Sequence, residues 1–433
     1  MTANSDIPEG HKATELGVLP EEWGITNLGN VSKIRGGYGF SPEFQGNIHE
    51  QFPFFKVSDM NLLGNEIEMT ISNNYVSEET IKKIRAKKFP RNTIIFPKVG
   101  GAVYTNKKRI LTNDSLIDNN LMGITLNSDA PCSADYLLFY FLIVDLKDLS
   151  NPGPLPSINA QRVKSLKIPI PPLPEQNAIA HVLRTVQEAK EKTDAVVAAT
   201  KALKAAMMKH LFTYGPVPPE EAERVALKET EIGQVPEEWD LQPLGNTSKI
   251  ASGGTPSRNE PTYWNGEIPW IRTGEINYSI IDMTEEKITK AGLENSSARI
   301  VPKGTLLMAM YGEGVTRGRV GITGIDASIN QAVAAIFPSE KMLTQFLYYY
   351  LEFSYEKNRL LGHGAHQRNL SATIIKTILV PIPTKETQHH IVEILSFIDQ
   401  KLAAEQSRKQ ALSTLFATLL TDLMTAKLRV NND

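Results

Sequence analysis

The sequence has one cysteine, Cys132, in 433 residues. A disulfide needs a pair of cysteines and a structural zinc site usually needs several thiolates, so the chain can build neither from its own cysteines. No apolar run approaches the roughly 18 residues of a membrane span. The first ten residues are polar and acidic, without the pattern of a signal peptide. These absences predict a cytoplasmic protein with no membrane association.

Catalytic motifs are also missing. The chain has no GxxxxGK[ST] phosphate loop and no Asn-Pro-Pro-aromatic motif of an adenine methyltransferase. The glycines of 312–318 have the wrong spacing for a nucleotide fingerprint and favour a turn at a strand end. His363 and His366 lie in the Gly-rich stretch 362–369 without further ligands nearby, which favours a solvated polar loop over a metal site and leaves phosphate or base contact open. We therefore expect no catalytic residue, no metal and no cofactor in this chain.

Basic charge is not in excess over the whole chain. The formal net charge is −2, whereas nucleic-acid binders usually carry a basic surface. Any contact with DNA must therefore be local, or partner proteins must supply positive charge. With 41% hydrophobic and 22% charged residues, the chain can bury cores and is not disordered.

The chain does contain a repeat of about half its length. Glu15-Leu16-Gly17 and the following Pro20–Trp23 return as Glu231-Ile232-Gly233 and Pro236–Trp239. Further pairs follow in the same order. They are Leu28–Asn30 with Leu244–Asn246, Pro53–Lys56 with Pro269–Arg272, Pro90–Phe96 with Pro302–Met308, Asn119-Asn120 with Asn330-Gln331, and Ile168–Pro171 with Val380–Pro383. The order of elements is thus the same in both copies.

Each copy reads as a β-rich domain followed by one long helix. Short β-type runs such as Thr93–Phe96 and Thr305–Met308 are separated by Gly, Pro and Asn, and short helices are expected near 134–145 and 343–355. The fold class is therefore α+β. The four tryptophans, Trp23, Trp239, Trp264 and Trp270, are interpreted as packing residues rather than base-stacking platforms.

The long helices show coiled-coil spacing. In the first copy a glutamine, Gln176, follows a Pro-rich opening, and Gln388 holds the matching place in the second. Apolar residues then recur at three-then-four spacing over about 40 residues, or about 60 Å. They are Ile179, Val182, Leu183, Val186, Val196, Val197, Leu203, Met207 and Leu211, and then Ile391, Ile394, Leu395, Ile398, Leu402, Leu412, Leu415, Leu419 and Leu423. Each helix must bury this seam to be stable, and the simplest partner is the other helix.

Positive charge gathers in one stretch of the first copy. Between Ile81 and Asn113 there are ten basic residues and no Asp or Glu. This predicts phosphate contact, with a merely solvated basic surface as the alternative. The residues that we select from the first copy are Arg35, Lys56, Lys87, Lys88, Arg91, Lys98, Lys107, Lys108 and Arg109.

The second copy has fewer candidates. Arg317-Gly318-Arg319 could enter a groove, because glycine lets the backbone approach closely and arginine can bond guanine with two hydrogen bonds. Arg272, Gln367 and Arg368 complete the set. The turns Gly36-Gly37 and Gly253-Gly254 are equivalent. They are interpreted as hairpin turns, with contact to DNA as the alternative. The framework matches between copies while the loops differ, which predicts two domains that dock alike and read different half-sites.

These features together resemble the specificity subunit of type I restriction–modification systems. Residues 254–257 (GTPS) and 263–276 (YWNGEIPWIRTGEI) look like the opening of that family's target-recognition domain. Residues 168–176 (IPIPPLPEQ) look like the start of its conserved helical region. The second exit, 380–388 (VPIPTKETQ), lacks Leu-Pro-Glu, and the first opening has Phe54-Phe55-Lys56 in place of Trp-Ile-Arg.

The resemblance implies an architecture and a set of partners. Target-recognition domains are expected at 14–167 and 230–379, helical regions at 168–215 and 380–430, and a linker at 216–229, with the helices paired as an antiparallel coiled coil of pseudo-twofold symmetry. Each domain would read half of a split site on double-stranded DNA. Two methylation subunits would bind S-adenosylmethionine and methylate adenine N6, and restriction subunits would use ATP and Mg²⁺. The other hypotheses are a self-contained nuclease or methyltransferase and a scaffold that no longer reads DNA.

Overall fold

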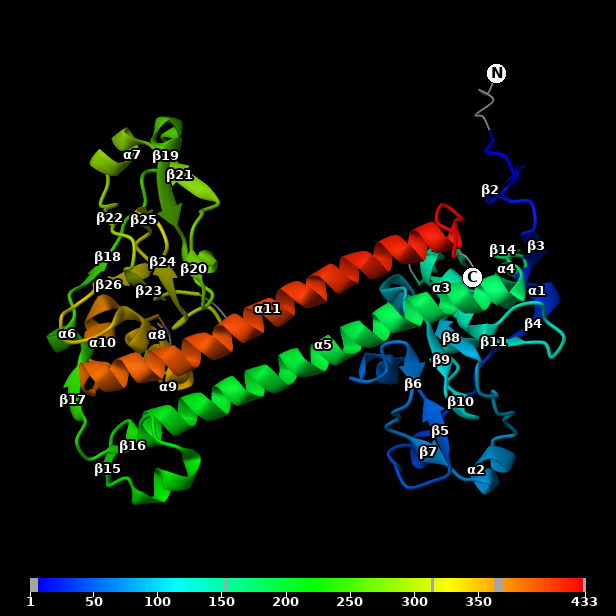
Figure 1. Ribbon diagram of the computed structural model, residues 1–433, viewed down its shortest axis with the longest axis horizontal. Helices are drawn as coiled ribbons and strands as arrows, with labels where there is room; N and C mark the ends of the chain where they lie inside the picture. The colour runs from blue at the N-terminus through cyan, green and yellow to red at the C-terminus, as the bar shows by residue number, and fades with distance from the viewer. Residues whose placement is uncertain (1–6, 152, 154, 313–314, 362–368, 431–433) are drawn as a thin grey trace. The chain divides into compact units, whose positions relative to one another are not determined.

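The computed structural model describes residues 7–151, 153, 155–312, 315–361 and 369–430. The chain forms two compact units (Figure 1), one made of residues 1–193 and 408–433 and the other of residues 194–407. Two long helices, α5 (Leu173–Tyr214) and α11 (Lys385–Met424), each contribute a segment to both units. The remaining elements belong to one unit each.

A pair of antiparallel strands forms the neck of each β-rich domain. In the first unit β3 (Gly24–Asn27) pairs with β14 (Lys167–Ile170), and in the second β17 (Asp240–Pro243) pairs with β27 (Leu379–Ile382). Each domain therefore begins and ends at one place, directly before its long helix. Hairpins precede the necks. They are β1 (His11–Thr14) with β2 (Gly17–Pro20), and β15 (Leu227–Thr230) with β16 (Gly233–Pro236).

The first domain, from β3 to β14, contains a five-stranded and a three-stranded sheet. Their strand orders are β4-β11-β8-β9-β6 and β10-β5-β7. The strands are β4 (Ser32–Gly36), β5 (Phe52–Phe55), β6 (Glu68–Met69), β7 (Tyr75–Val76), β8 (Ile94–Pro97), β9 (Arg109–Leu111), β10 (Leu116–Ile117) and β11 (Leu121–Leu126). The helical elements are α1 (Leu28–Val31), η1 (Pro42–Phe44), η2 (Val57–Asn61), α2 (Glu78–Lys83), η3 (Gly100–Thr105), α3 (Ala134–Ile143) and α4 (Ala160–Lys164), and a small β12–β13 ribbon pairs Ser150–Asn151 with Ser157–Ile158.

The second domain, from β17 to β27, repeats this topology with one additional strand in its smaller sheet. Its sheets have the orders β18-β26-β23-β24-β20 and β21-β19-β25-β22. The strands are β18 (Ile250–Ser252), β19 (Trp264–Ile271), β20 (Ile280–Ile281), β21 (Glu286–Ile288), β22 (Ile300–Val301), β23 (Leu306–Ala309), β24 (Val320–Thr323), β25 (Ala327–Ile329) and β26 (Val333–Ile336). The helical elements are α6 (Leu244–Thr247), η5 (Pro261–Tyr263), η6 (Thr273–Glu275), α7 (Lys290–Glu294), α8 (Thr344–Phe353), α9 (Tyr355–Arg359) and α10 (Ala372–Lys376), with η4 (Pro219–Arg224) in the segment before β15.

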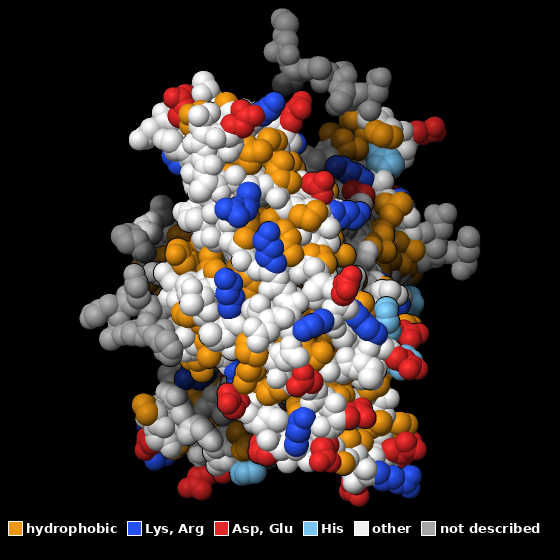
Figure 2. Space-filling view, turned by 90° about the vertical axis from the view of Figure 1, so that its left-hand side faces the viewer, with side chains coloured by type: hydrophobic (Ala, Val, Ile, Leu, Met, Phe, Trp, Pro, Cys, Tyr) orange, Lys and Arg blue, Asp and Glu red, His pale blue; other side chains and the backbone are white. Residues whose placement is uncertain are grey.

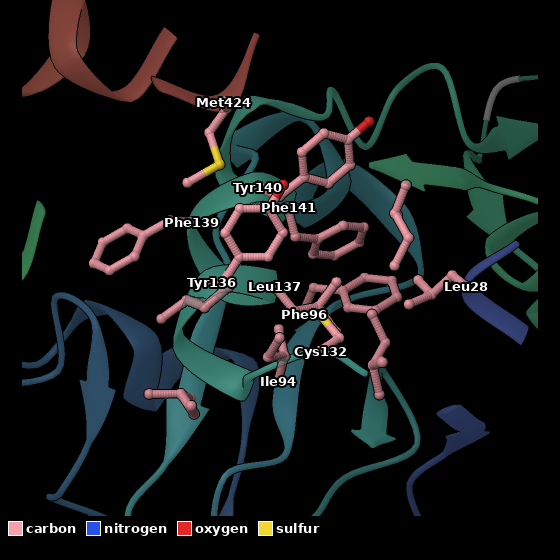
Figure 3. Close-up of a cluster of buried hydrophobic side chains, with 14 of the residues drawn as sticks. Leu28, Ile94, Phe96, Cys132, Tyr136, Leu137, Phe139, Tyr140, Phe141 and Met424 are labelled. Atoms are coloured by element: carbon pink, nitrogen blue, oxygen red, sulfur yellow. The ribbon is translucent and has the colours of Figure 1, made fainter. Parts of the chain in front are cut away.

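A short apolar helix forms the centre of each core. Helix α3 buries six consecutive residues from Tyr136 to Phe141. Figure 3 shows Tyr136, Phe139 and Phe141 of this run in one cluster with Ile94 and Phe96 of β8 and Met424 of α11. Helix α8 buries the matching run from Phe346 to Leu351 in the second unit. A helix buried all round packs against both a sheet and the long helices. The expected helices near 134–145 and 343–355 are thus confirmed.

The long helices pack against each other within each unit. In the first unit Leu183 of α5 shares a core with Leu420 and Leu423 of α11. In the second, Leu211 of α5 shares a core with Ile391 of α11. The start of one helix therefore meets the end of the other, and the pairing is antiparallel. The predicted fold class, α+β with a long helix after each domain, is confirmed.

Part of the predicted helical seam is not buried. Val196 and Leu203 of α5 are exposed, and so is Leu415 of α11. A repeat of three and four residues drifts around a straight helix of 3.6 residues per turn, so some members leave the contact. Burial is concentrated instead at the ends of each helix, where the domains also pack. In the described part of the chain, no helix combines the length and apolarity that a membrane crossing requires.

A buried glutamine joins each domain to its long helix. The Gln176 amide nitrogen donates to the carbonyls of Pro131 and Pro171, and its oxygen accepts from the Ser133 N–H at 2.8 Å. Gln388 makes the same three bonds, to Lys341, Pro383 and Leu343. Both side chains are fully buried. Their amides satisfy backbone groups of the loop before α3 or α8 and of the turn before α5 or α11.

We expect Gln388→Leu to lower the free energy of unfolding by about 2–4 kcal/mol, because buried N–H and C=O groups lose their partners. Denaturant titration followed by tyrosine and tryptophan fluorescence measures this change. Gln406→Leu is the matched control, because Gln406 is an exposed residue of the same helix. Equal stability of the two variants would contradict the role of the Gln388 amide.

Candidate nucleic-acid interface

Three turns of each domain converge beside the smaller sheet. In the first domain the end of β4 lies against the β10–β11 turn, since the Gly37 N–H donates to Leu121 O and the Tyr38 N–H to Ile117 O. The third turn follows β5, whose last carbonyl, Phe55 O, accepts from the Asp118 N–H. The second domain repeats these contacts. Gly254 N–H donates to Ile329 O, and Asn330 N–H donates to Ile271 O.

The glycines at these turns allow a close approach of two backbones. A Cβ on Gly37 would lie 2.1 Å from the Asp118 carbonyl oxygen, and one on Gly253 would lie 1.8 Å from Ile329 O. A side chain at either place would force the strands apart. The Gly-Gly pairs therefore have a packing role at the turn.

The structure shifts one correspondence of the repeat by a residue. The Asp118 carboxylate accepts from the Asn120 N–H at 2.9 Å, and the Asn330 amide oxygen accepts from the Ala332 N–H at 3.0 Å. Asp118 therefore corresponds to Asn330, and Asn119 to Gln331. The correspondence of Asn119 with Asn330 predicted from the sequence is therefore wrong by one residue, because it rested on the identity of the two asparagines. Burial raises the pKa of the Asp118 carboxyl.

Lys56 and Arg272 occupy the same turn. The Lys56 N–H donates to the Asp59 carboxylate at 2.8 Å, and the Arg272 N–H donates to Glu275 at 2.6 Å. Each residue thus begins a 3-10 turn closed by the acidic residue three places on. The first copy has Lys56 where the second has Arg272, and this difference changes the side chain at the turn but not the backbone.

The other basic residues of the first domain lie on several different elements, and Arg91 lines a groove together with Asp135 and Arg184. Lys87 and Arg91 are exposed. Arg35 stacks on Phe89 at 3.7 Å and donates to the Tyr38 hydroxyl. Lys88 pairs with Glu78 and lies 3.9 Å from the centre of the Phe52 ring. Lys98 lies against Gly36, and Lys107 donates to Asn61.

Two residues of the predicted basic patch have structural partners instead. The Lys108 side chain is fully buried and donates to Asn106 and to the Val144 carbonyl, and burial lowers its pKa to about 8. Arg109 donates to the carbonyls of Asn65, Lys108 and Met60. Hydrogen bonds to neighbouring carbonyl groups hold both side chains in the protein. We therefore do not propose that they contact DNA.

The second domain carries an arginine–tryptophan cluster that the sequence analysis missed. The Arg258 guanidinium lies 3.7 Å from the centre of the Trp264 ring and 5.2 Å from that of Trp270. Its fork also bonds both oxygens of Glu286, the second at 3.0 Å. These hydrogen bonds hold the pKa of the Glu286 carboxyl below its ordinary value. Arg258 and Glu286 are 28 residues apart in the sequence. The pairing of β19 with β21 brings them together, so the sequence alone did not predict the cluster.

Arg272 extends this cluster. Its guanidinium pairs with Glu285 and reaches Glu286 at 3.3 Å. We name Arg258, Arg272, Glu285 and Glu286 the arginine–glutamate cluster. The interpretation of the tryptophans as packing residues is confirmed for Trp23, Trp239 and Trp270, which are buried. Trp264 is partly exposed and supports Arg258.

The remaining predicted residues lie elsewhere or outside the described chain. Arg319 donates to the Asn277 side chain at 2.7 Å, and Arg317 is half-buried one turn before β24. Gln367, Arg368, His363 and His366 lie outside the described residues. On the face shown in Figure 2, Lys and Arg side chains alternate with Asp, Glu and apolar side chains.

A polar groove of about 590 Å³ lies between the first domain and α5. Its central residue, Arg184, bonds Asp135 of α3 and reaches Glu68 of β6 at 2.8 Å. The second unit has a related cluster, in which Lys204 of α5 bonds Glu352 of α8 and Asp399 of α11, at 2.9 and 2.8 Å. These charges pair domain with helix. Among the described residues, no group of three His, Cys, Asp or Glu side chains is placed to hold a metal ion.

Comparisons with known proteins agree with this duplicated architecture. A family model described as the type I restriction modification DNA specificity domain matches residues 20–196 and 236–414. The chain is 24% identical to the MjaVIII specificity subunit of Methanocaldococcus jannaschii, over 96% of this chain and 95% of that protein. It is also 24% identical to the EcoBI specificity subunit of Escherichia coli, over 99% and 90%. A crystal structure of the M. genitalium type I restriction–modification S subunit superposes with a TM-score of 0.60, 15% identity and 98% coverage of both chains.

The close approach at Gly37 gives a direct test of the interface turn. Gly37→Ala should lower stability by about 1–3 kcal/mol, because the new methyl group overlaps two carbonyl oxygens. Gly39→Ala is the matched control two residues away, where an added Cβ meets nothing within 4 Å. Thermal denaturation of both variants compares them. A Gly37→Ala protein as stable as Gly39→Ala would show that the turn tolerates a side chain.

Proposed function

The chain belongs to the type I restriction–modification DNA specificity family, and from this premise we propose that its two domains each read one half of a bipartite, asymmetric DNA site. Family membership makes the chain the DNA specificity subunit of such a system, itself non-catalytic.

One observation carries the proposal. The three-turn interface has the same backbone in both domains but different side chains, with Lys56 and Asp118 in one and Arg272 and Asn330 in the other. A shared backbone predicts a shared way of docking on the duplex. Different donors and acceptors predict different base preferences, because base edges present distinct patterns in the major groove.

Phosphate contacts would supply affinity around the reading turns. We assign this role to Arg35, Lys87, Lys88, Arg91, Lys98 and Lys107 in the first domain, and to Arg317 and Arg319 in the second. Gln367 and Arg368 remain proposals from the sequence. Such contacts position the protein without reading sequence. The net charge of −2 favours binding by the assembled complex over binding by this chain alone.

The partners would perform the chemistry. Two methylation subunits, which bind S-adenosylmethionine, would dock on the long helices and domains and methylate adenine N6 in each half-site after flipping the base. Restriction subunits that use ATP and Mg²⁺ would cut unmethylated DNA. The helices, of 42 and 40 residues, would set the length of the unread spacer.

The first test maps the methylated motif. The chain, produced with its methylation subunits in a host lacking other N6-adenine methylation, should yield two short half-motifs separated by a fixed unread spacer. Single-molecule sequencing of the host genome detects them. A continuous motif would contradict reading by two domains.

The second test concerns the spacer. Removing seven residues from each helix at facing positions shortens the pair by about 10 Å, equivalent to about three base pairs at 3.4 Å each. We expect the half-motifs to persist while the spacer changes. Altered half-motifs with an unchanged spacer would contradict a role of the helices in spacing.

A further inference from the structure

Among the described residues of the first domain, neutral side chains occupy the places of Glu285 and Glu286. Trp270 pairs with Glu286 across β19 and β21, and the equivalent Phe54 N–H bonds Asn74 O. Asn73 and Asn74 therefore stand where the second domain has Glu285 and Glu286. Lys56, the equivalent of Arg272, bonds a neutral partner, the Gln45 amide oxygen, at 2.9 Å. At these two places, therefore, the second domain has carboxylates and the first has neutral amides.

The two carboxylates bond the arginines as DNA acceptors would. A guanidinium fork bonds a carboxylate, a phosphate, or the O6 and N7 of guanine through the same pair of parallel N–H groups. The side chains are accessible, with 51% of Arg258 and 38% of Arg272 exposed. Exposed ion pairs contribute little stability, so an incoming acceptor pair can replace them.

We infer that Glu285 and Glu286 determine the specificity of the second domain by holding the forks of Arg258 and Arg272 until a matching acceptor pair on DNA displaces them. This inference rests on the proposed function. The stacking of Arg258 on Trp264 keeps its guanidinium in place during the exchange. DNA that offers no acceptor pair in register leaves the forks bonded to the carboxylates, so the positive charges of Arg258 and Arg272 are withheld from the backbone phosphates. Specificity arises from this withheld charge on wrong sequences as well as from attraction to the right one.

The consequence is a measurable penalty on non-specific binding. Glu285→Gln and Glu286→Gln keep the side-chain shape but remove the charge. The assembled methyltransferase carrying both substitutions should bind a duplex with a scrambled second half-site about three- to tenfold more tightly than the unmodified complex. The slope of log K against log salt should become steeper by about one to two, because more phosphates are then neutralised by protein.

The experiment compares two duplexes, one with the mapped site and one with its second half-site scrambled, from 50 to 200 mM NaCl. The control is Glu294→Gln in α7, which removes the same charge from a glutamate that pairs with Lys290 rather than an arginine. Glu285→Gln is also tested alone, because Glu285 is 71% exposed and its substitution leaves the fold intact. Thermal denaturation verifies folding of each variant.

Two results would support the inference and identify the acceptor. A steeper salt slope with an unchanged methylated motif assigns the forks to phosphates, and a motif relaxed at one base pair assigns them to a guanine edge. If the variants bind both duplexes as the unmodified complex does, or no differently from Glu294→Gln, the role of the glutamates is overturned. An unmodified complex that does not distinguish the two duplexes would overturn the proposed function and the inference together.

Discussion

The arrangement of each domain on its helix depends on one buried amide. Gln176 and Gln388 each bond three backbone groups, and these groups belong to two segments, the loop before α3 or α8 and the turn before the long helix. A buried polar side chain is stable only when its partners are all in place. Each glutamine therefore ties the domain core to the first turn of the long helix. The position of each domain, with its three converging turns, relative to its long helix therefore depends on this junction.

Ion pairs reinforce the same junction differently in the two units. The first uses Arg184 with Asp135 and Glu68, and the second uses Lys204 with Glu352 and Asp399. Burial raises the pKa of Glu352, although Lys204 opposes this effect. In the segment that follows α11, Arg429 bonds Glu175 of α5, which also accepts from the Trp23 indole. The neck of the first domain is thus tied to both long helices.

The two interfaces differ in electrostatics more than in shape. At the equivalent turns, Lys56 of the first domain bonds the neutral Gln45 amide, whereas Arg272 of the second bonds the Glu285 carboxylate. Lysine is a point charge suited to phosphate, and arginine has a planar fork suited to paired acceptors. Duplication has therefore kept the backbone of these turns and changed the charged side chains that they carry.

Much of the architecture followed from the sequence because its signals are local. Ordered matches such as Pro20–Trp23 with Pro236–Trp239 established the duplication, and apolar spacing predicted the long helices within a few residues of α5 and α11. The prediction that Val196 and Leu203 belong to a buried seam was wrong, since both are exposed. Apolar periodicity alone does not define which helix turns pack against another element.

The candidate site required tertiary structure. Lys108 and Arg109 look like Lys107 in sequence, yet Lys108 is buried against the Val144 carbonyl and Arg109 bonds three backbone carbonyls. Arg258 became a candidate only in the structure, where it contacts Trp264 of β19 and Glu286 of β21. The sequence by itself determined the repeat, the α+β class, the helices and the family. Tertiary structure decided which charges face solvent and which pair, because these depend on contacts between residues far apart in the chain.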